Sequence, residues 1–281
     1  MKKVLAFDCG ATNTRLALIN EKFKIEKVLI NPTPVNSKES WVQNLISLIE
    51  QFPIEDVVAI SLGVPGVCDR ENGVITDLPN VHITDIHIRE ILEEKYNIPV
   101  YLRNDAEVAC LGEAYLGAGK GKSRVFFITI SSGLGGALCV ESINQDYVTE
   151  IGHTAYMYKG KLTEYEKLVS GVNIHNLTEL NNHPEITSGR QLFDGVRNKD
   201  KACLEIFAEW KNILNDFIGL VCRTYFPDII CVTGGMTKAK DLYFPELKRK
   251  NRPTKIVECK FSEDAGLIGS GVYGFQCAKI I

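Results

Sequence analysis

The sequence lacks a strong bias toward either charge and lacks any long apolar run. Its 32 basic and 35 acidic residues leave a formal net charge of −3, so there is no basic field to attract nucleic acid or an anionic membrane. A bilayer-spanning helix needs about 20 apolar residues; no run approaches that length, and the run that begins at Val4 ends at Asp8. We therefore expect no nucleic-acid partner, no membrane partner and a cytoplasmic location.

Paired cysteine motifs are also missing. The nine cysteines contain no Cys-x-x-Cys pair, and several of them, such as Cys139 and Cys231, stand inside apolar stretches. This pattern favours reduced, buried cysteines over a disulfide framework. With 281 residues, 45% of them hydrophobic, the chain is long enough for two medium-sized domains with apolar cores.

Two familiar nucleotide-binding motifs are incomplete or absent. The segment 117–123 ends in Gly-Lys-Ser like a P-loop, but Leu116 stands where that motif needs glycine. The order of elements is also reversed, since the segment follows a predicted helix and precedes a predicted strand. No Gly-x-Gly-x-x-Gly opens a helix after a strand, so a dinucleotide-binding fold has no support. We interpret residues 117–123 as an exposed linker at a domain boundary.

Apolar periodicity predicts strands and helices on both sides of this linker. Before it, the first thirty residues predict a three-stranded antiparallel meander, and residues 37–51 have helical spacing. After it, residues 125–140 repeat the opening pattern of strand, small-residue turn and returning strand. Further helices are expected around residues 86–97, 171–180 and 199–226. We expect an N-terminal α/β domain at residues 1–116, a larger one at 117–264, and a C-terminal helix at about 265–281 that packs back on the first.

Both hairpin turns contain mostly small residues. A polyphosphate needs backbone N–H groups that it can approach closely, and bulky side chains at a tight turn would block that approach. Asp8 precedes the first turn and offers a carboxylate that could hold Mg²⁺ directly or through water. Either turn alone could be an ordinary hairpin, but two in one chain predict a polyphosphate site. The residues concerned are Gly10, Ala11, Thr12 and Asn13 in the first turn, and Ser132, Gly133, Leu134 and Gly135 in the second.

A polar pair, Asn104 and Asp105, stands where a predicted strand passes into a predicted helix. By itself such a pair is most often a helix cap. The chain also contains Glu150-Ile151-Gly152-His153 and, further on, Glu166 before Ser170-Gly171. In order and spacing these motifs, together with the two glycine turns, resemble the ROK family (repressors, open reading frames, kinases) of bacterial sugar kinases. The resemblance runs nearly end to end, because it also covers Gly63-Val64-Pro65-Gly66, Pro79-Asn80 and Gly234-Gly235.

The resemblance implies a two-domain α/β fold of the actin/hexokinase-like (ribonuclease H-like) type with an interdomain cleft, and a reaction that uses ATP and Mg²⁺. It implies that Asp105 is the catalytic base that accepts the proton of the sugar hydroxyl, that Asn104 binds the sugar ring, and that Asp8 faces the metal. A shell of carboxylates, an amide and an imidazole suits a sugar, whose hydroxyls both donate and accept hydrogen bonds. The remaining implied roles are hydroxyl contacts for Glu150, His153 and Glu166, a loop near the sugar for Gly66 and Asn80, and a turn beside the adenosine for Gly234 and Gly235.

The sequence departs from the family after His153. Most ROK members carry a cysteine cluster there that binds zinc together with the histidine, but no cysteine stands between His153 and Glu166. We therefore expect no structural zinc. Another contact must then orient the imidazole, and we expect it from a nearby tyrosine. The candidates are Tyr156, Tyr158 and Tyr165.

These features predict a kinase that phosphorylates a hexose or N-acylhexosamine with ATP, at the 6-hydroxyl. The missing zinc loop and the absence of Gly-Trp after Pro79-Asn80 favour N-acetylmannosamine or allose over glucose. One alternative is a sugar-sensing ROK regulator, although we expect no DNA-binding region before the first glycine turn, which begins at Asp8. The other is an ATPase of the actin or heat-shock type, which needs no sugar-binding residues. Dimers are common in the family, so a homodimer is a further expectation.

Overall fold

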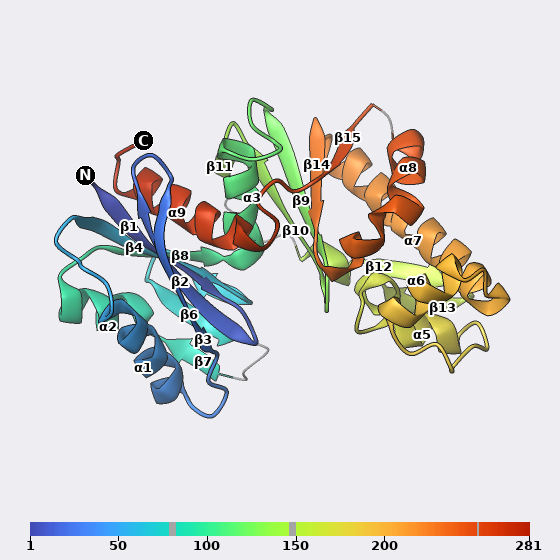
Figure 1. Cartoon of the computed structure of the whole chain (residues 1–281), viewed down its shortest axis with the longest axis horizontal. Coiled ribbons are helices and arrows are strands. Elements are labelled where there is room, and N and C mark those ends of the chain that lie inside the picture. The colour runs from blue at the N-terminus through green and yellow to red at the C-terminus, as the bar shows by residue number, and fades with distance from the viewer. Residues whose placement is uncertain (79–82, 146–149, 252) are drawn as a thin grey trace. The chain divides into compact units, whose positions relative to one another are not determined.

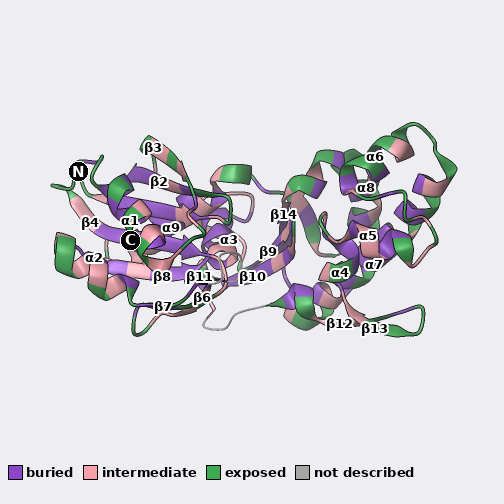
Figure 2. Ribbon diagram, turned by 90° about the horizontal axis from the view of Figure 1, so that it is seen from below, coloured by how far each residue is buried: buried purple, intermediate pink, exposed green. Residues whose placement is uncertain are grey.

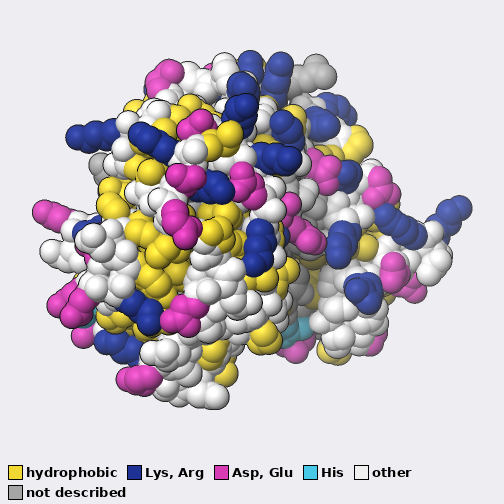
Figure 3. Space-filling view, turned by 60° about the vertical axis from the view of Figure 1, so that its left-hand side comes forward, with side chains coloured by type: hydrophobic (Ala, Val, Ile, Leu, Met, Phe, Trp, Pro, Cys, Tyr) yellow, Lys and Arg dark blue, Asp and Glu magenta, His cyan; other side chains and the backbone are white. Residues whose placement is uncertain are grey.

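The computed structural model describes residues 1–78, 83–145, 150–251 and 253–281 (Figure 1). The chain forms two compact units: unit 1 comprises Met1–Gly117 and Glu263–Ile281, and unit 2 comprises Ala118–Ser262. Within these described ranges, no helix combines the length and the apolar character that a membrane span requires. Lys and Arg are interspersed with Asp and Glu over the face drawn in Figure 3, in keeping with the balanced composition.

Unit 1 is built on a five-stranded sheet with the order β3-β2-β1-β4-β8. The first three strands are antiparallel neighbours in sequence order, so the predicted meander is confirmed. The other two strands continue the sheet parallel to β1. The strands are β1 (Lys3–Cys9), β2 (Asn13–Asn20), β3 (Ile25–Pro32), β4 (Val57–Val64) and β8 (Val100–Asn104).

Both faces of this sheet are covered, which explains why the middle of β1, from Val4 to Phe7, is apolar without interruption. Along β1, Leu5 and Phe7 belong to a core that includes Trp41 of α1. Val4 and Ala6 point to the opposite face, where they pack in a second core with residues of α9. The remaining elements of unit 1 are α1 (Lys38–Ile49), β5 (Val67–Asp69), β6 (Val74–Leu78), β7 (Ile83–Ile86), α2 (Ile88–Tyr96), α3 (Asp105–Tyr115), η3 (Ser262–Asp264, whose first residue belongs to unit 2) and α9 (Ala265–Cys277).

Unit 2 repeats this plan with a sheet of order β11-β10-β9-β14-β15. Its predicted hairpin is confirmed, because β9 and β10 pair antiparallel. Strands β14 and β15 continue the sheet parallel to β9. Phe126, Ile128 and Ile130 share a core with Trp210 and Phe217 of the long helix α7. Figure 2 shows the inner strands of both sheets as largely buried, whereas the edge strand β3 is not. The strands are β9 (Arg124–Ile130), β10 (Leu134–Val140), β11 (Ile143–Asn144), β14 (Ile229–Thr233) and β15 (Lys255–Glu258).

Several elements of unit 2 were not predicted. A helix was expected around 171–180, where the structure has only the short α5, and α6, α8 and the hairpin β12–β13 were missed. The hairpin occupies the stretch in which the family resemblance led us to look for cysteines. The elements are η1 (Ile151–His153), β12 (Ala155–Tyr158), β13 (Lys161–Glu164), α4 (Glu166–Val169), α5 (Ile174–Glu179), α6 (Gly189–Arg197), α7 (Lys201–Tyr225), η2 (Gly235–Ala239) and α8 (Lys240–Lys250).

Candidate active site

The carboxyl edge of the unit 1 sheet brings three predicted site segments together. Asp8 of β1 lies opposite Gly63 of β4, and Gly63 lies opposite Arg103 of β8. Neighbouring strands are spaced by about 4.8 Å, so the backbones of Asp8 and Arg103 are about 10 Å apart. Asn104 and Asp105 follow directly at the same edge, where ligands of open α/β sheets commonly bind.

Asn104 is the N-cap of α3, and its side chain also reaches a predicted sugar loop. Its Oδ1 accepts a hydrogen bond from the backbone N–H of Ala106 at 2.9 Å, and its Nδ2 donates to the carbonyl oxygen of Gly66 at 3.1 Å. Asp105 is the first residue of α3, and its Oδ1 accepts from the same N–H at 2.7 Å. The helix-cap interpretation is therefore correct for Asn104 and does not conflict with a ligand role, because the cap fixes the corner that carries Asp105.

The first glycine turn is held in place by Thr33, the residue that follows β3. Gly10 donates its N–H to the carbonyl oxygen of Asn13 at 3.0 Å, which closes the turn. Thr33 donates its hydroxyl to the carbonyl oxygen of Gly10 at 2.7 Å and its N–H to that of Thr12 at 2.9 Å. Ala11, Thr12 and Asn13 are exposed. The turn thus keeps a fixed shape while its tip stays open to a ligand.

Asp8 lies in a partly buried position beside the start of α9. Burial raises the pKa of its carboxyl, while the Arg15 guanidinium, 3.8 Å away from Nη1 to Oδ2, opposes that rise. Arg15 makes its closer pair with Asp264, at 2.5 Å. A carboxylate that burial penalises and that is only loosely paired suits a divalent cation, for which carboxylate oxygens are preferred ligands. Asp8 therefore fits the predicted Mg²⁺ role, and the ion would supply positive charge beside the phosphates of ATP.

The second glycine turn is contacted by a carboxylate that the sequence did not predict there. Ser131 donates its N–H to the carbonyl oxygen of Gly133 at 2.9 Å, which closes the turn between β9 and β10. Leu134 follows Gly133, and its backbone N–H donates to Oε2 of Glu166 at 2.9 Å. Glu166 was predicted to contact sugar hydroxyls, and the structure places its carboxylate directly at the turn that was predicted to bind phosphate.

Gly152 brings the Glu150–His153 segment against the same residue. A Cβ atom on Gly152 would lie 1.9 Å from the carbonyl oxygen of Leu134, so only glycine allows the η1 turn to approach β10 this closely. The backbone of Leu134 is thus contacted by Glu166 at its N–H and by Gly152 at its carbonyl group. Unit 2 therefore joins the second glycine turn, Ser132 to Gly135, to Glu166 and to the short segment that carries Glu150 and His153, the three residues predicted to bind hydroxyls.

A carboxylate, and not a tyrosine, contacts the imidazole of His153. Its Nδ1 lies 3.0 Å from Oε2 of Glu164, and this hydrogen bond is the main cause of the raised pKa of His153. The tyrosine expectation is wrong. The hydroxyl of Tyr156 donates to Asp216 at 2.9 Å and that of Tyr158 to Glu209 at 3.1 Å, while the ring of Tyr165 packs on Phe217.

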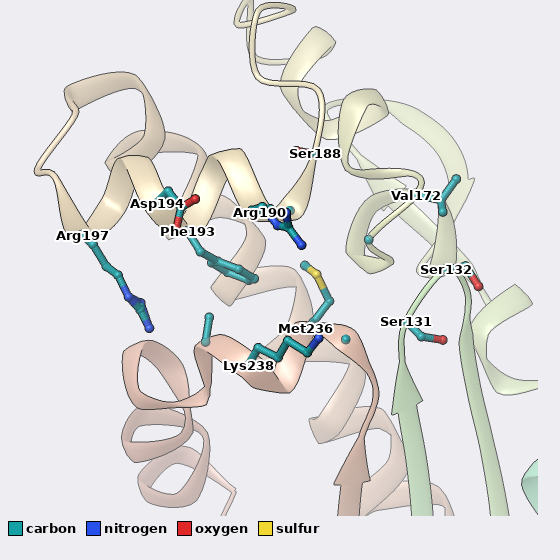
Figure 4. Close-up of a pocket in the computed structure, with 14 residues that line it drawn as sticks. Ser131, Ser132, Val172, Ser188, Arg190, Phe193, Asp194, Arg197, Met236 and Lys238 are labelled. Atoms are coloured by element: carbon teal, nitrogen blue, oxygen red, sulfur yellow. The ribbon is translucent and has the colours of Figure 1, made fainter. Parts of the chain in front are cut away.

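A cavity of about 610 Å³ lies within unit 2 between α6 and the η2 turn. Figure 4 shows the side chains of Arg190 and Phe193 from α6 and of Met236 and Lys238 from η2 around it. Ser131 and Ser132 of the second glycine turn also line the cavity. An apolar ring, a thioether and two cations beside a glycine-rich turn can accommodate a base, a ribose and phosphate groups.

The two glycines of the predicted adenosine turn have separate roles. Gly234 has a φ of +103°, and a Cβ there would lie 2.3 Å from the carbonyl oxygen of Ile130, so β14 can end against β9 only with glycine at this position. A Cβ on Gly235 would meet no atom within 4 Å. Gly235 lines the cavity, so it leaves space that a ligand could use.

A model of the ROK family matches residues 4–272 of this sequence. The chain belongs to the ROK family. A glucokinase from Thermotoga maritima is 26% identical over a gapped alignment of 305 positions, which covers 95% of this chain and 96% of the glucokinase. The proposed family and the proposed family fold are therefore confirmed.

Two solved structures are similar to this chain along nearly its whole length. A proposed N-acetylmannosamine kinase from Listeria monocytogenes superposes with a TM-score of 0.85, at 22% identity, over 99% of both chains. A ROK family glucokinase from Streptomyces griseus, solved in complex with glucose and AMPPNP, gives a TM-score of 0.77 at 21% identity, over 98% of this chain and 99% of the glucokinase. The actin/hexokinase-like fold of this ROK chain follows from these likenesses.

Sequence reasoning missed the cavity wall of this ROK protein. Ser188 is the N-cap of α6 and accepts the N–H of Gln191 at 3.2 Å, and a serine followed three residues later by glutamine is a sequence signal for a helix start. That signal could have placed α6, but no pattern indicated that Arg190 and Phe193 share a cavity with Met236. Asn80 lies outside the described residues, so its predicted role stays a prediction.

Proposed function

We propose that this ROK protein transfers the γ-phosphoryl group of ATP to a hexose or an N-acylhexosamine, with the 6-hydroxyl as acceptor. The predicted enzyme class, an ATP:sugar phosphotransferase, agrees with the glucokinase from Thermotoga maritima. The observation that carries the proposal is the junction at Leu134, whose backbone links a phosphate-type turn to Glu166 and to the segment that carries Glu150 and His153. An ATPase without a sugar substrate would have no use for that linkage.

Asp105 is proposed as the base. It opens α3, where the positive end of the helix dipole favours a carboxylate. An ionised carboxylate is a modest base, but phosphoryl transfer proceeds through a loose transition state in which positioning and charge stabilisation dominate. The hydrogen bonds of the Asn104 side chain therefore matter as much as the proton affinity of Asp105, because they fix the backbone position of Asp105 at the start of α3.

The remaining residues are proposed to bind and orient. Glu150, His153 and Glu166 would hold sugar hydroxyls, while the turns after Asp8 and Ile130 would offer backbone N–H groups to the phosphates. The cavity beside Gly235 would take the adenosine. N-acetylmannosamine and allose stand ahead of glucose in our proposal for the reasons given by the sequence.

A coupled assay of ADP release tests the proposal. The wild type and Asp105→Asn are compared with glucose, N-acetylmannosamine and allose, and Asp56→Asn, which changes a carboxylate 60% exposed in the same unit, is the control. We expect ADP release that depends on one of these sugars, a loss of roughly 10²- to 10⁴-fold in Asp105→Asn, and sugar binding that is retained in calorimetry. Undiminished turnover in Asp105→Asn would refute the role of the base. Sugar binding without turnover in the wild type would favour a sugar sensor.

A further inference from the structure

His153 has a backbone that is already fixed by its neighbours. Its N–H donates to the carbonyl oxygen of Glu150 at 3.1 Å, and the N–H of Thr154 donates to that of Ile151 at 3.2 Å. Gly152 is pressed against Leu134. The imidazole itself is about half exposed, so its torsion angles are the remaining freedom that a ligand contact would have to restrict.

The hairpin β12–β13 delivers a carboxylate to that imidazole. The two strands pair from Tyr158 with Lys161 back to Ala155 with Glu164. Lys159 and Gly160 form the two-residue connection with φ values of 48° and 77°, as a tight hairpin with a type I′ turn requires. This register places Glu164 across from a residue only two positions after His153, so a local hairpin brings the two side chains together.

The hairpin is itself anchored on α7. Tyr156 and Tyr158 donate their hydroxyls to Asp216 and Glu209 of that helix. The Tyr156 ring also packs on Tyr165, with ring centroids 4.5 Å apart. Because α7 belongs to the main core of the unit, Glu164 stands on a supported element and not on a free loop.

We propose that Glu164 is a positioning residue that fixes the orientation and the tautomer of His153 and so presents Nε2 to a sugar hydroxyl. This inference rests on the proposed function. The carboxylate accepts from Nδ1–H at 3.0 Å, and an acceptor at one ring nitrogen determines which proton the other carries. In the neutral ring Nε2 is then an acceptor for the hydroxyl; in the charged ring it is a donor.

The surrounding charges act in the same direction. Glu164, Glu166 and Glu150 all raise the pKa of His153, while partial burial opposes the rise. The pair therefore contributes stability that is complete below the ordinary value of 6.5 and is lost as the pH rises through the higher value of the folded protein. Removing the charge of Glu164 must lower the pKa of His153.

Two substitutions separate geometry from charge. Glu164→Gln keeps an oxygen that can accept from Nδ1–H but removes the charge, whereas Glu164→Ala removes both. Glu185→Gln is the matched control, because Oε1 of Glu185 lies 3.0 Å from Nδ1 of His183 and neither residue belongs to the proposed site. All variants are full-length, and their sugar KM and kcat are measured with the best substrate of the wild type among glucose, N-acetylmannosamine and allose.

We expect Glu164→Ala to raise the sugar KM by roughly 3- to 10-fold, as the loss of one hydrogen bond would, with kcat changed less than about twofold. Glu164→Gln should restore KM, while NMR titration should show a lowered His153 pKa in both variants. Glu185→Gln should change none of these values. A KM for Glu164→Ala equal to that of the wild type, or an unchanged His153 titration, would overturn the inference. If the wild type phosphorylates none of the sugars, the proposed function fails. The NMR titration then still tests whether Glu164 contacts His153.

Discussion

The close approach of Gly152 to Leu134 allows a quantitative prediction for Gly152→Ala. The new Cβ would lie 1.9 Å from the carbonyl oxygen of Leu134. An ordinary contact between carbon and oxygen is about 3.4 Å, so the two segments must separate by about 1.5 Å. Leu134 is 3% exposed and paired within the sheet. The η1 turn must therefore move, and it carries Glu150 and His153 with it.

Such a displacement should reduce activity far more than stability. Overpacking of a close contact costs about 1–3 kcal/mol of the free energy of unfolding. A misplacement of about 1 Å in a binding group can lower the rate about 10²-fold. We therefore expect kcat/KM for the sugar to fall by about 10²-fold, measured by coupled ADP release, in a protein that still unfolds cooperatively in urea.

Gly121→Ala is the control for a loss of stability alone. Gly121 has a φ of +77°, and a Cβ there would meet no atom within 4 Å. Alanine at this position should be strained by about 1 kcal/mol or more without displacing any neighbour. Activity near that of the wild type in a folded Gly152→Ala protein would refute the steric argument, and so would an equal loss of activity in Gly121→Ala.

Two further predictions concern unit 1. Glu107→Ala should lower the free energy of unfolding in urea by about 2 kcal/mol, because it removes a charge-assisted hydrogen bond of 3.0 Å to Arg103 between two side chains that are each 7% exposed; a change below about 0.5 kcal/mol would contradict this. Asp8→Asn should abolish phosphoryl transfer yet raise the melting temperature of the unliganded protein at neutral pH. Burial raises the pKa of Asp8. The wild-type protein therefore loses stability as the pH rises through the pKa of the folded state, because a buried carboxyl must then ionise. The gain in melting temperature of Asp8→Asn should vanish as the pH falls toward the ordinary pKa of 3.8. A gain that is equal at acid and neutral pH would exclude this origin.

Local patterns in the sequence were reliable where the backbone alone decides the structure. The meander of unit 1 and the hairpin of residues 124–140 follow from apolar runs separated by small residues, and both were found. The cap at Asn104 follows from a polar side chain at a strand-to-helix corner, and its hydrogen bond to Ala106 is present. Each of these features depends on residues that are close in sequence.

The partners of the charged side chains were harder to predict. Glu166 was assigned to a sugar from the family resemblance, but its hydrogen bond goes to Leu134, 32 residues away. His153 was expected to contact a tyrosine in place of the missing zinc, but its partner is Glu164. The hairpin connection at Lys159-Gly160 was not recognised, so the carboxylate at its far end was not considered.

The sequence by itself determined the two hairpins with glycine-rich turns, the corner at Asn104 and Asp105, and membership of the ROK family. These features arise from backbone geometry and from motif order, both of which are written along the chain. Only the tertiary structure decided that Leu134 joins Glu166 to Gly152, that Glu164 holds His153, and that α6 and η2 enclose a cavity. A carboxylate can satisfy its charge with many donors, and packing alone determines which donor lies within reach.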